Sequence, residues 1–102
     1  MPRYLLFGGD VFIRGERHRN GSVIEFEGEP SPGMSPLDTE ATRAKLASMP
    51  AVLAASDRYP QRVILLAKSL DGAPRCVASA RVHIERWVAE QAVTETQHAD
   101  HR

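Results

Sequence analysis

The chain has a single cysteine, Cys76, no long apolar run and no net charge. One cysteine excludes an internal disulfide, and small secreted domains usually depend on such bridges. The apolar run near the start, Tyr4 to Phe7, is too short for a signal peptide or a membrane span. We therefore expect a cytoplasmic protein that does not associate with a membrane.

The 13 basic and 13 acidic side chains balance each other within 102 residues. Proteins whose main task is to hold nucleic acid are usually basic, because phosphate neutralisation supplies most of their affinity. Neutrality therefore counts against nucleic acid as the main partner. It also implies weak self-repulsion, which permits contacts with other proteins or with copies of the same chain.

Motifs that carry chemistry are also missing, since no Walker loop, GxSxG, HExxH or CxxC pair occurs. Cys76, His83 and Glu85 could supply a nucleophile, a base and an orienting group. On a helix, however, the seven-residue spacing separates Cys76 from His83 by about 10 Å, beyond hydrogen-bond reach. His98 and His101 have a usable metal spacing, but structural zinc needs four rigidly held ligands. We expect no enzyme, no cofactor and no metal.

Residues 3–27 have the pattern of short strands joined by tight turns. Val11–Ile13 is apolar and ends at Arg14-Gly15, whereas residues 22–27 alternate like a half-buried strand. Asn20-Gly21 just before that strand readily supplies the positive φ angles of a type I′ turn. The pattern predicts a small antiparallel β-meander of three or four strands, with an SH3-like form as one option.

The segment 28–36, GEPSPGMSP, holds three prolines and two glycines, which predicts a loop without regular structure. Asp38 or Thr39 can cap a helix that Pro50 should end, and residues 51–55 could add a further turn or two. Residues 62–67 are a continuous apolar run. This run fits a strand covered on both faces or a buried helical turn, and we take the strand.

Residues 76–91 can be interpreted as a helix or as a strand. A helical period places six apolar side chains on one stripe, namely Cys76, Val77, Ala80, Ile84, Trp87 and Val88. The alternation of a strand breaks after Ile84, so we predict a helix. Cys76 is then a small buried hydrophobe and Trp87 fills the core, or alternatively anchors an interface, since tryptophan is enriched in binding hot spots.

Together these elements predict an α+β fold in which two helices and one further strand pack against the meander. The single domain is expected to span residues 1–93: the meander in 3–27, the loop in 28–36 and a helix-strand-helix in 38–93. Residues 94–102 are polar, and we expect them to form a disordered tail.

The basic side chains around the expected turn are the one candidate site for an anion or a nucleic acid: Arg14, Arg17, His18 and Arg19. No glycine-rich cradle or helix start accompanies them, and Glu16 lies beside them. We therefore interpret them as a solvated turn. Asn20-Gly21-Ser22 matches the N-glycosylation pattern, but a cytoplasmic chain cannot use it.

Residues 11–47 combine an apolar strand, glycine, a second strand, Asn-Gly, an alternating strand, a proline-rich loop and an alanine-rich helix. The order is carried by Gly15, Gly21, Ile24, Phe26, Pro36, Leu37, Asp38 and Ala41. In this order of elements the chain resembles small accessory proteins of tailed phages and bacterial prophages. The resemblance implies a role in assembly and a location in the cytoplasm or the virion, and it transfers no functional residues.

The sequence therefore favours a non-enzymatic structural or protein-interaction protein, plausible as a prophage-derived accessory component. The alternative is a small nucleic-acid-binding or regulatory module that uses the arginines of the turn.

Overall fold

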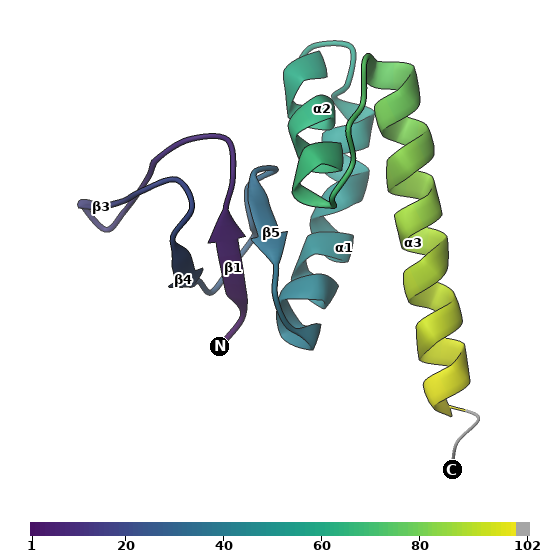
Figure 1. The fold of residues 1–102 in the computed structure, drawn as a ribbon, viewed down its shortest axis with the longest axis horizontal. Coiled ribbons are helices and arrows are strands. Elements are labelled where there is room, and N and C mark those ends of the chain that lie inside the picture. The colour runs from purple at the N-terminus through teal and green to yellow at the C-terminus, as the bar shows by residue number, and fades with distance from the viewer. Residues whose placement is uncertain (100–102) are drawn as a thin grey trace.

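The structure is a computed structural model that describes residues 1–99, with side chains described as far as residue 93. Within these residues five short strands precede three helices: β1 (Arg3–Leu6), β2 (Val11–Ile13), β3 (Glu16–His18), β4 (Val23–Glu25), β5 (Met34–Pro36), α1 (Thr39–Ala54), α2 (Pro60–Ser69) and α3 (Val77–Ala99). Figure 1 shows the strands on one side and the helices on the other, with β5 beside α1 where they meet. The predicted α+β class is confirmed.

β1 is the central strand of a three-stranded antiparallel sheet, with β4 and β5 at its edges. Tyr4 lies opposite Ile24, and Leu6 lies opposite Met34. Alternate residues of a strand point to the same face, so these four side chains gather on one side of the sheet. They are buried there together with Ala41 of α1, which makes α1 the cover of the β core.

The strands do not form the simple meander that the sequence predicts. β2 and β3 pair with each other in a separate two-stranded sheet, and the chain then returns to place β4 beside β1. Gly8 and Gly9 have φ angles of 92° and 144°, and these angles, which favour glycine, turn the chain out of the sheet after β1. This three-plus-two arrangement does not confirm an SH3-like form.

The Pro/Gly segment contains a strand, β5, where the sequence predicts only a loop. The Phe7 N–H donates to the Gly33 carbonyl at 2.8 Å, and a Cβ on Gly33 would lie 2.2 Å from the Phe7 carbonyl oxygen. Glycine therefore permits the close approach that starts the pairing. Pro36 is tolerated because it ends an edge strand, where a missing N–H costs little.

Asp38 is one of the two residues that the sequence predicts as the cap of this helix. It caps α1 by accepting a hydrogen bond from the Ala41 N–H at 2.8 Å. The helix does not end at Pro50, however, but continues to Ala54. A proline inside a helix costs about 3 kcal/mol. Met49 and Leu53, on either side of Pro50, pack into the helical core, and we attribute the continuation to their burial.

Residues 60–69 form the helix α2, so the strand predicted over residues 62–67 is wrong. Pro60 occupies the first turn, where its missing N–H does not matter. Val63, Leu66, Ala67 and Leu70 are buried, and their spacing of three, one and three residues places them on one helical face. The apolar run is helical because its buried stripe extends past residue 67 to Leu70.

α3 confirms the helix predicted over residues 76–91. Ala80 and Ile84 are buried in the helical core with residues of α2. The Arg81 Nη2 donates to the Leu53 carbonyl at 3.3 Å and to the Ser56 Oγ at 3.1 Å, which ties α3 to the end of α1. The backbone stays helical through Ala99 where the sequence predicts a disordered tail from residue 94, and residues 100–102 lie outside the described part.

α1 also buries a lysine, Lys45, whose side chain is 0% exposed. Its Nζ donates to the carbonyl oxygens of Ser31 at 3.1 Å and Pro32 at 2.8 Å, so it holds the loop before β5 against the helix. Burial lowers the pKa of this amine to about 7, because removal from water disfavours the charged form.

The buried amine predicts a pH-dependent stability. The unfolded chain, with the ordinary lysine pKa of 10.5, binds one proton more than the folded chain between about pH 7 and that value. The free energy of unfolding should therefore rise with pH across this window, by at most about 1.4 kcal/mol per pH unit for one proton. Lys45→Met should remove the slope, as measured by denaturant unfolding across the window. Lys68→Met, at an exposed position of α2, is the matched control, and an unchanged slope in Lys45→Met would contradict the assignment.

Candidate functional site

The predicted basic turn lies on the hairpin formed by β2 and β3. Ile13 pairs with Glu16, so Arg14 and Gly15 are the two turn residues. Their φ angles are 53° and 79°, and positive angles at both positions are typical of a type I′ turn. The type I′ turn is therefore at Arg14-Gly15 and not at Asn20-Gly21, where the sequence predicts it.

Asn20 and Gly21 form a different turn, in which the Ser22 N–H donates to the Arg19 carbonyl at 3.1 Å. Of its two central residues only Gly21 has a positive φ, of 88°, as in a type II turn. The Ser22 hydroxyl donates to the same carbonyl at 2.5 Å. The turn leads the chain out of the hairpin and into β4.

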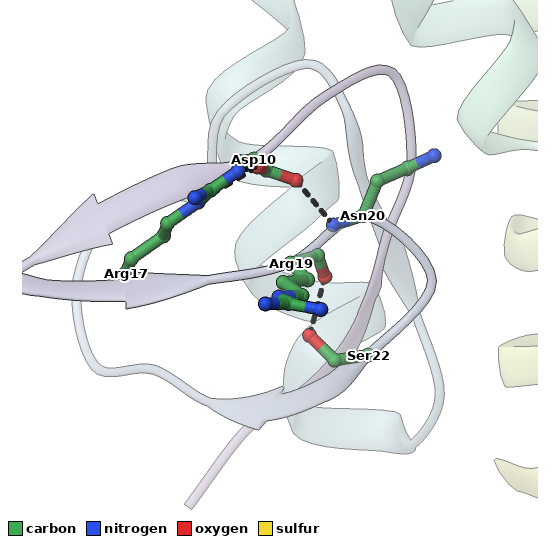
Figure 2. Close-up of polar contacts among 5 residues, drawn as sticks. All are labelled: Asp10, Arg17, Arg19, Asn20 and Ser22. Carbon is green, nitrogen blue, oxygen red and sulfur yellow. Dashed lines mark hydrogen bonds and ion pairs between the residues drawn. The ribbon is translucent and has the colours of Figure 1, made fainter.

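Asp10 organises the polar side of the hairpin, as Figure 2 shows. Its Oδ2 accepts hydrogen bonds from Nε and Nη2 of Arg17, the first at 2.9 Å. Its Oδ1 accepts the Asn20 backbone N–H at 2.8 Å. One carboxylate thus balances the charge of Arg17 and fixes the start of the next turn.

The basic residues of the hairpin do not converge on one point. Arg17 is engaged with Asp10, and His18 lies opposite Val11 in the register and is half-buried. Arg14 is at the exposed tip of the hairpin, and in Figure 2 the Arg19 side chain extends near Ser22, away from Arg17. The arrangement agrees with a solvated turn, and the anion or nucleic-acid contact remains a prediction.

The hairpin also exposes an aromatic side chain that the sequence-based search missed. Phe12 is 71% exposed and lies directly opposite Arg17. Its neighbours Val11 and Ile13 point to the other face and pack against the β core. The alternation of a strand was the available signal, since a three-residue apolar strand with two inward side chains leaves the middle one outside.

A second candidate surface lies on the helical part, between α1 and α3. A depression of 390 Å³ is lined by Leu46, Met49, Pro50, Leu53, Ile84, Glu85 and Val88. Glu85 is the one charged residue of this lining. We call this depression the α1–α3 groove, and its chemistry is suited to an apolar side chain of another polypeptide.

Trp87, the predicted core residue or interface anchor, is half-buried and packs against the helical core. It does not line the α1–α3 groove. Its position therefore agrees with the interpretation as a core residue.

Cys76 is exposed, so the expectation of a buried cysteine is wrong. It immediately precedes α3, and hydrogen bonds from the Ser79 backbone and hydroxyl lower the pKa of its thiol. His83 has a different partner: its Nε2 lies 2.7 Å from the Leu70 carbonyl oxygen and must donate to it. The structure gives Cys76 and His83 separate partners.

The part of the chain that the structure describes contains no group of three or more metal-binding side chains. The pair His98 and His101 falls outside the residues whose side chains are described. None of the described helices is long and apolar enough to cross a membrane.

Comparisons of the chain with protein-family models, curated proteins and solved structures found no match. The comparisons therefore suggest no function for this chain.

The Asp10 cluster predicts a measurable titration. The Asn20 N–H and then the Arg17 side chain lower the pKa of the Asp10 carboxyl below its ordinary 3.8. Its contribution to hairpin stability should therefore be present above pH 3.8 and be lost as the pH falls through the folded value. NMR of the carboxyl should show that Arg17→Met raises its midpoint but leaves it below 3.8, because the Asn20 bond remains. Arg14→Met, at the tip, is the control, and equal effects of both variants would contradict the pairing.

Proposed function

We propose that this protein is a non-enzymatic protein-interaction module that acts as an assembly component. The observation that carries the proposal is the α1–α3 groove, a depression with one charged residue in its lining. Val88 at its border is 37% exposed, and further along α3 Val93 is 55% exposed. Exposed apolar side chains gathered at a groove are typical of the centre of protein–protein contacts.

The separate partners of His83 and Cys76 support a role other than catalysis. His83 is held by the Leu70 carbonyl, and the Cys76 thiol is paired with Ser79. The first contact ties α3 to the end of α2, and the second lies at the start of α3. They explain these two residues through packing and capping.

A nucleic-acid-binding module is the second candidate, and Phe12 is the observation that favours it. An exposed aromatic ring beside arginines can stack on an unpaired base while the arginines approach phosphates. Arg17, however, is already neutralised by Asp10. The chain is also neutral as a whole, so we rank this candidate below protein interaction.

A prophage origin, which the resemblance of residues 11–47 implies, would make capsid or tail proteins the natural partners. The protein would then work in the host cytoplasm or in the virion. Head or tail genes next to its own gene would support this origin, and a different neighbourhood would count against it.

The proposal predicts complexes that depend on the groove. Sedimentation velocity over a concentration series, alone and with the products of neighbouring genes, should give species heavier than the 11.3 kDa chain. Val88→Glu should weaken these complexes at least about tenfold, since it places a charge at an apolar contact. Val23→Glu, at an exposed valine of the sheet, is the control. A strict monomer that binds no partner would remove the proposal.

The same reasoning predicts weak binding to nucleic acid. Fluorescence anisotropy with single-stranded DNA and RNA at low salt should give no saturable binding. Saturable binding that falls steeply with salt, and that is lost in Phe12→Ala and in Arg17→Ala with Arg19→Ala, would favour the second candidate instead.

A further inference from the structure

A hollow of 350 Å³ lies beside the first turns of α3, against the loop that leads into this helix from α2. Two of its lining residues are on the loop and four are on α3: Ala73, Pro74, Ser79, Val82, His83 and Arg86. At 100° per residue the four helical residues lie within about 100° of one another around α3, and Val88 lies on the opposite side of the helix. The hollow is therefore separate from the α1–α3 groove, and we call it the α3 pocket.

The charge of the α3 pocket is positive. None of the described lining residues is acidic, whereas Arg86 is fully charged and exposed. Within the part of the chain whose side chains are described, no carboxylate forms an ion pair with Arg86. The Ser79 hydroxyl donates to the Cys76 carbonyl at 3.0 Å, so its proton is already used. Arg86 is thus the group in this pocket that can bind an oxyanion.

His83 is held in place from two sides. Its Nε2 donates to the Leu70 carbonyl at 2.7 Å. A Cβ on Gly72 would lie 2.7 Å from the His83 Cδ2, so glycine lets the loop lie against the ring. Because Nε2 is engaged, Nδ1 is the ring nitrogen left for a ligand, and in the neutral ring it accepts a hydrogen bond. Residues three apart are neighbours on a helix surface, so one small ligand can contact both His83 and Arg86.

The pocket therefore asks for a ligand that accepts at Arg86 and donates at Nδ1 of His83. A phosphate monoester does both. Its anionic oxygens accept from a guanidinium, and because its second pKa is about 6, part of it keeps a P–O–H proton at neutral pH. A carboxylic acid, with an ordinary pKa of about 4, has lost its proton there. Val82 and Pro74 add apolar wall, which suits an apolar group next to the phosphate.

We propose that the α3 pocket binds a small phosphate monoester, with its phosphate between Arg86 and Nδ1 of His83 and its organic group against Val82 and Pro74. The volume of 350 Å³ is at the lower end of the range of about 300–1,000 Å³ that small-molecule sites occupy. The site goes beyond the proposed function, because it lies on the other side of α3 from the groove and does not depend on it.

Calorimetric titration with phenyl phosphate at pH 7 tests the site. The chain should bind this ester saturably, and Arg86→Gln should weaken binding at least about tenfold, because it removes a charge-assisted hydrogen bond. Arg75→Gln is the matched control, since Arg75 is an exposed arginine at the same end of α3 but outside the lining. Equal losses in the two variants, or no saturable binding to the unaltered chain, would overturn the proposal.

Benzoate tests the choice of phosphate, because it carries a carboxylate on the same ring. It should bind more weakly than phenyl phosphate, and equal affinity would overturn the assignment. Inorganic phosphate should also bind more weakly, because it lacks the group that contacts Val82 and Pro74. A phosphotyrosine peptide that binds where phenyl phosphate does not would assign the pocket to a phosphorylated protein and overturn the small ligand.

NMR of the His83 ring tests where the phosphate lies. His83 also holds the Leu70 carbonyl, so a substitution would disturb the loop as well as remove Nδ1. The ¹⁵N resonance of Nδ1 in the unaltered chain avoids this difficulty, and it should shift as phenyl phosphate saturates the site. An Nδ1 resonance that does not change on saturation would overturn the placement of the phosphate beside His83.

Discussion

Lys45 reaches from α1 to the carbonyl oxygens of Ser31 and Pro32, in an interior where an amine without acceptors would cost several kcal/mol. The requirement to satisfy this amine fixes the loop on the helix, and the loop leads directly into β5. From β5 the Ser35 hydroxyl donates to the Ser69 carbonyl at the end of α2, at 2.6 Å. β5 is thus hydrogen-bonded directly to the end of α2, and the loop before it is hydrogen-bonded to α1. The β core and the helical core keep their relative position through this junction.

Elements with local determinants could be predicted from the sequence, and elements with distant partners could not. Asp38 caps the helix that starts one residue later, so its role was visible in a few letters. The pairing at β5 depends on the Phe7 carbonyl approaching Gly33 across 26 positions, and no local pattern reports such an approach. α2 is an intermediate case, because its helical stripe is complete only when Leu70, outside the apolar run, is counted.

For the candidate surfaces, too, features set by neighbouring residues could be predicted, and features set by distant residues could not. The composition of the turn drew attention to Arg17, but its partner Asp10 lies across the hairpin and belongs to a different local pattern. Whether Phe12 is inside or outside depends on which face of the hairpin meets the β core. The α1–α3 groove joins Leu46 to Val88, and only the packing of three helices brings these residues together. Sequence reasoning therefore found the charges of the site more readily than its shape.

The difference in length between the helices bears on how the helical part behaves. α2 has 10 residues and α3 has 23, so at 1.5 Å per residue α2 is about 15 Å long and α3 about 34 Å. α2 can therefore cover only the first half of α3. Isolated helical segments of about 12 residues are marginal in water, so the part of α3 beyond the reach of α2 depends on other contacts, such as the one that Val88 makes in the α1–α3 groove.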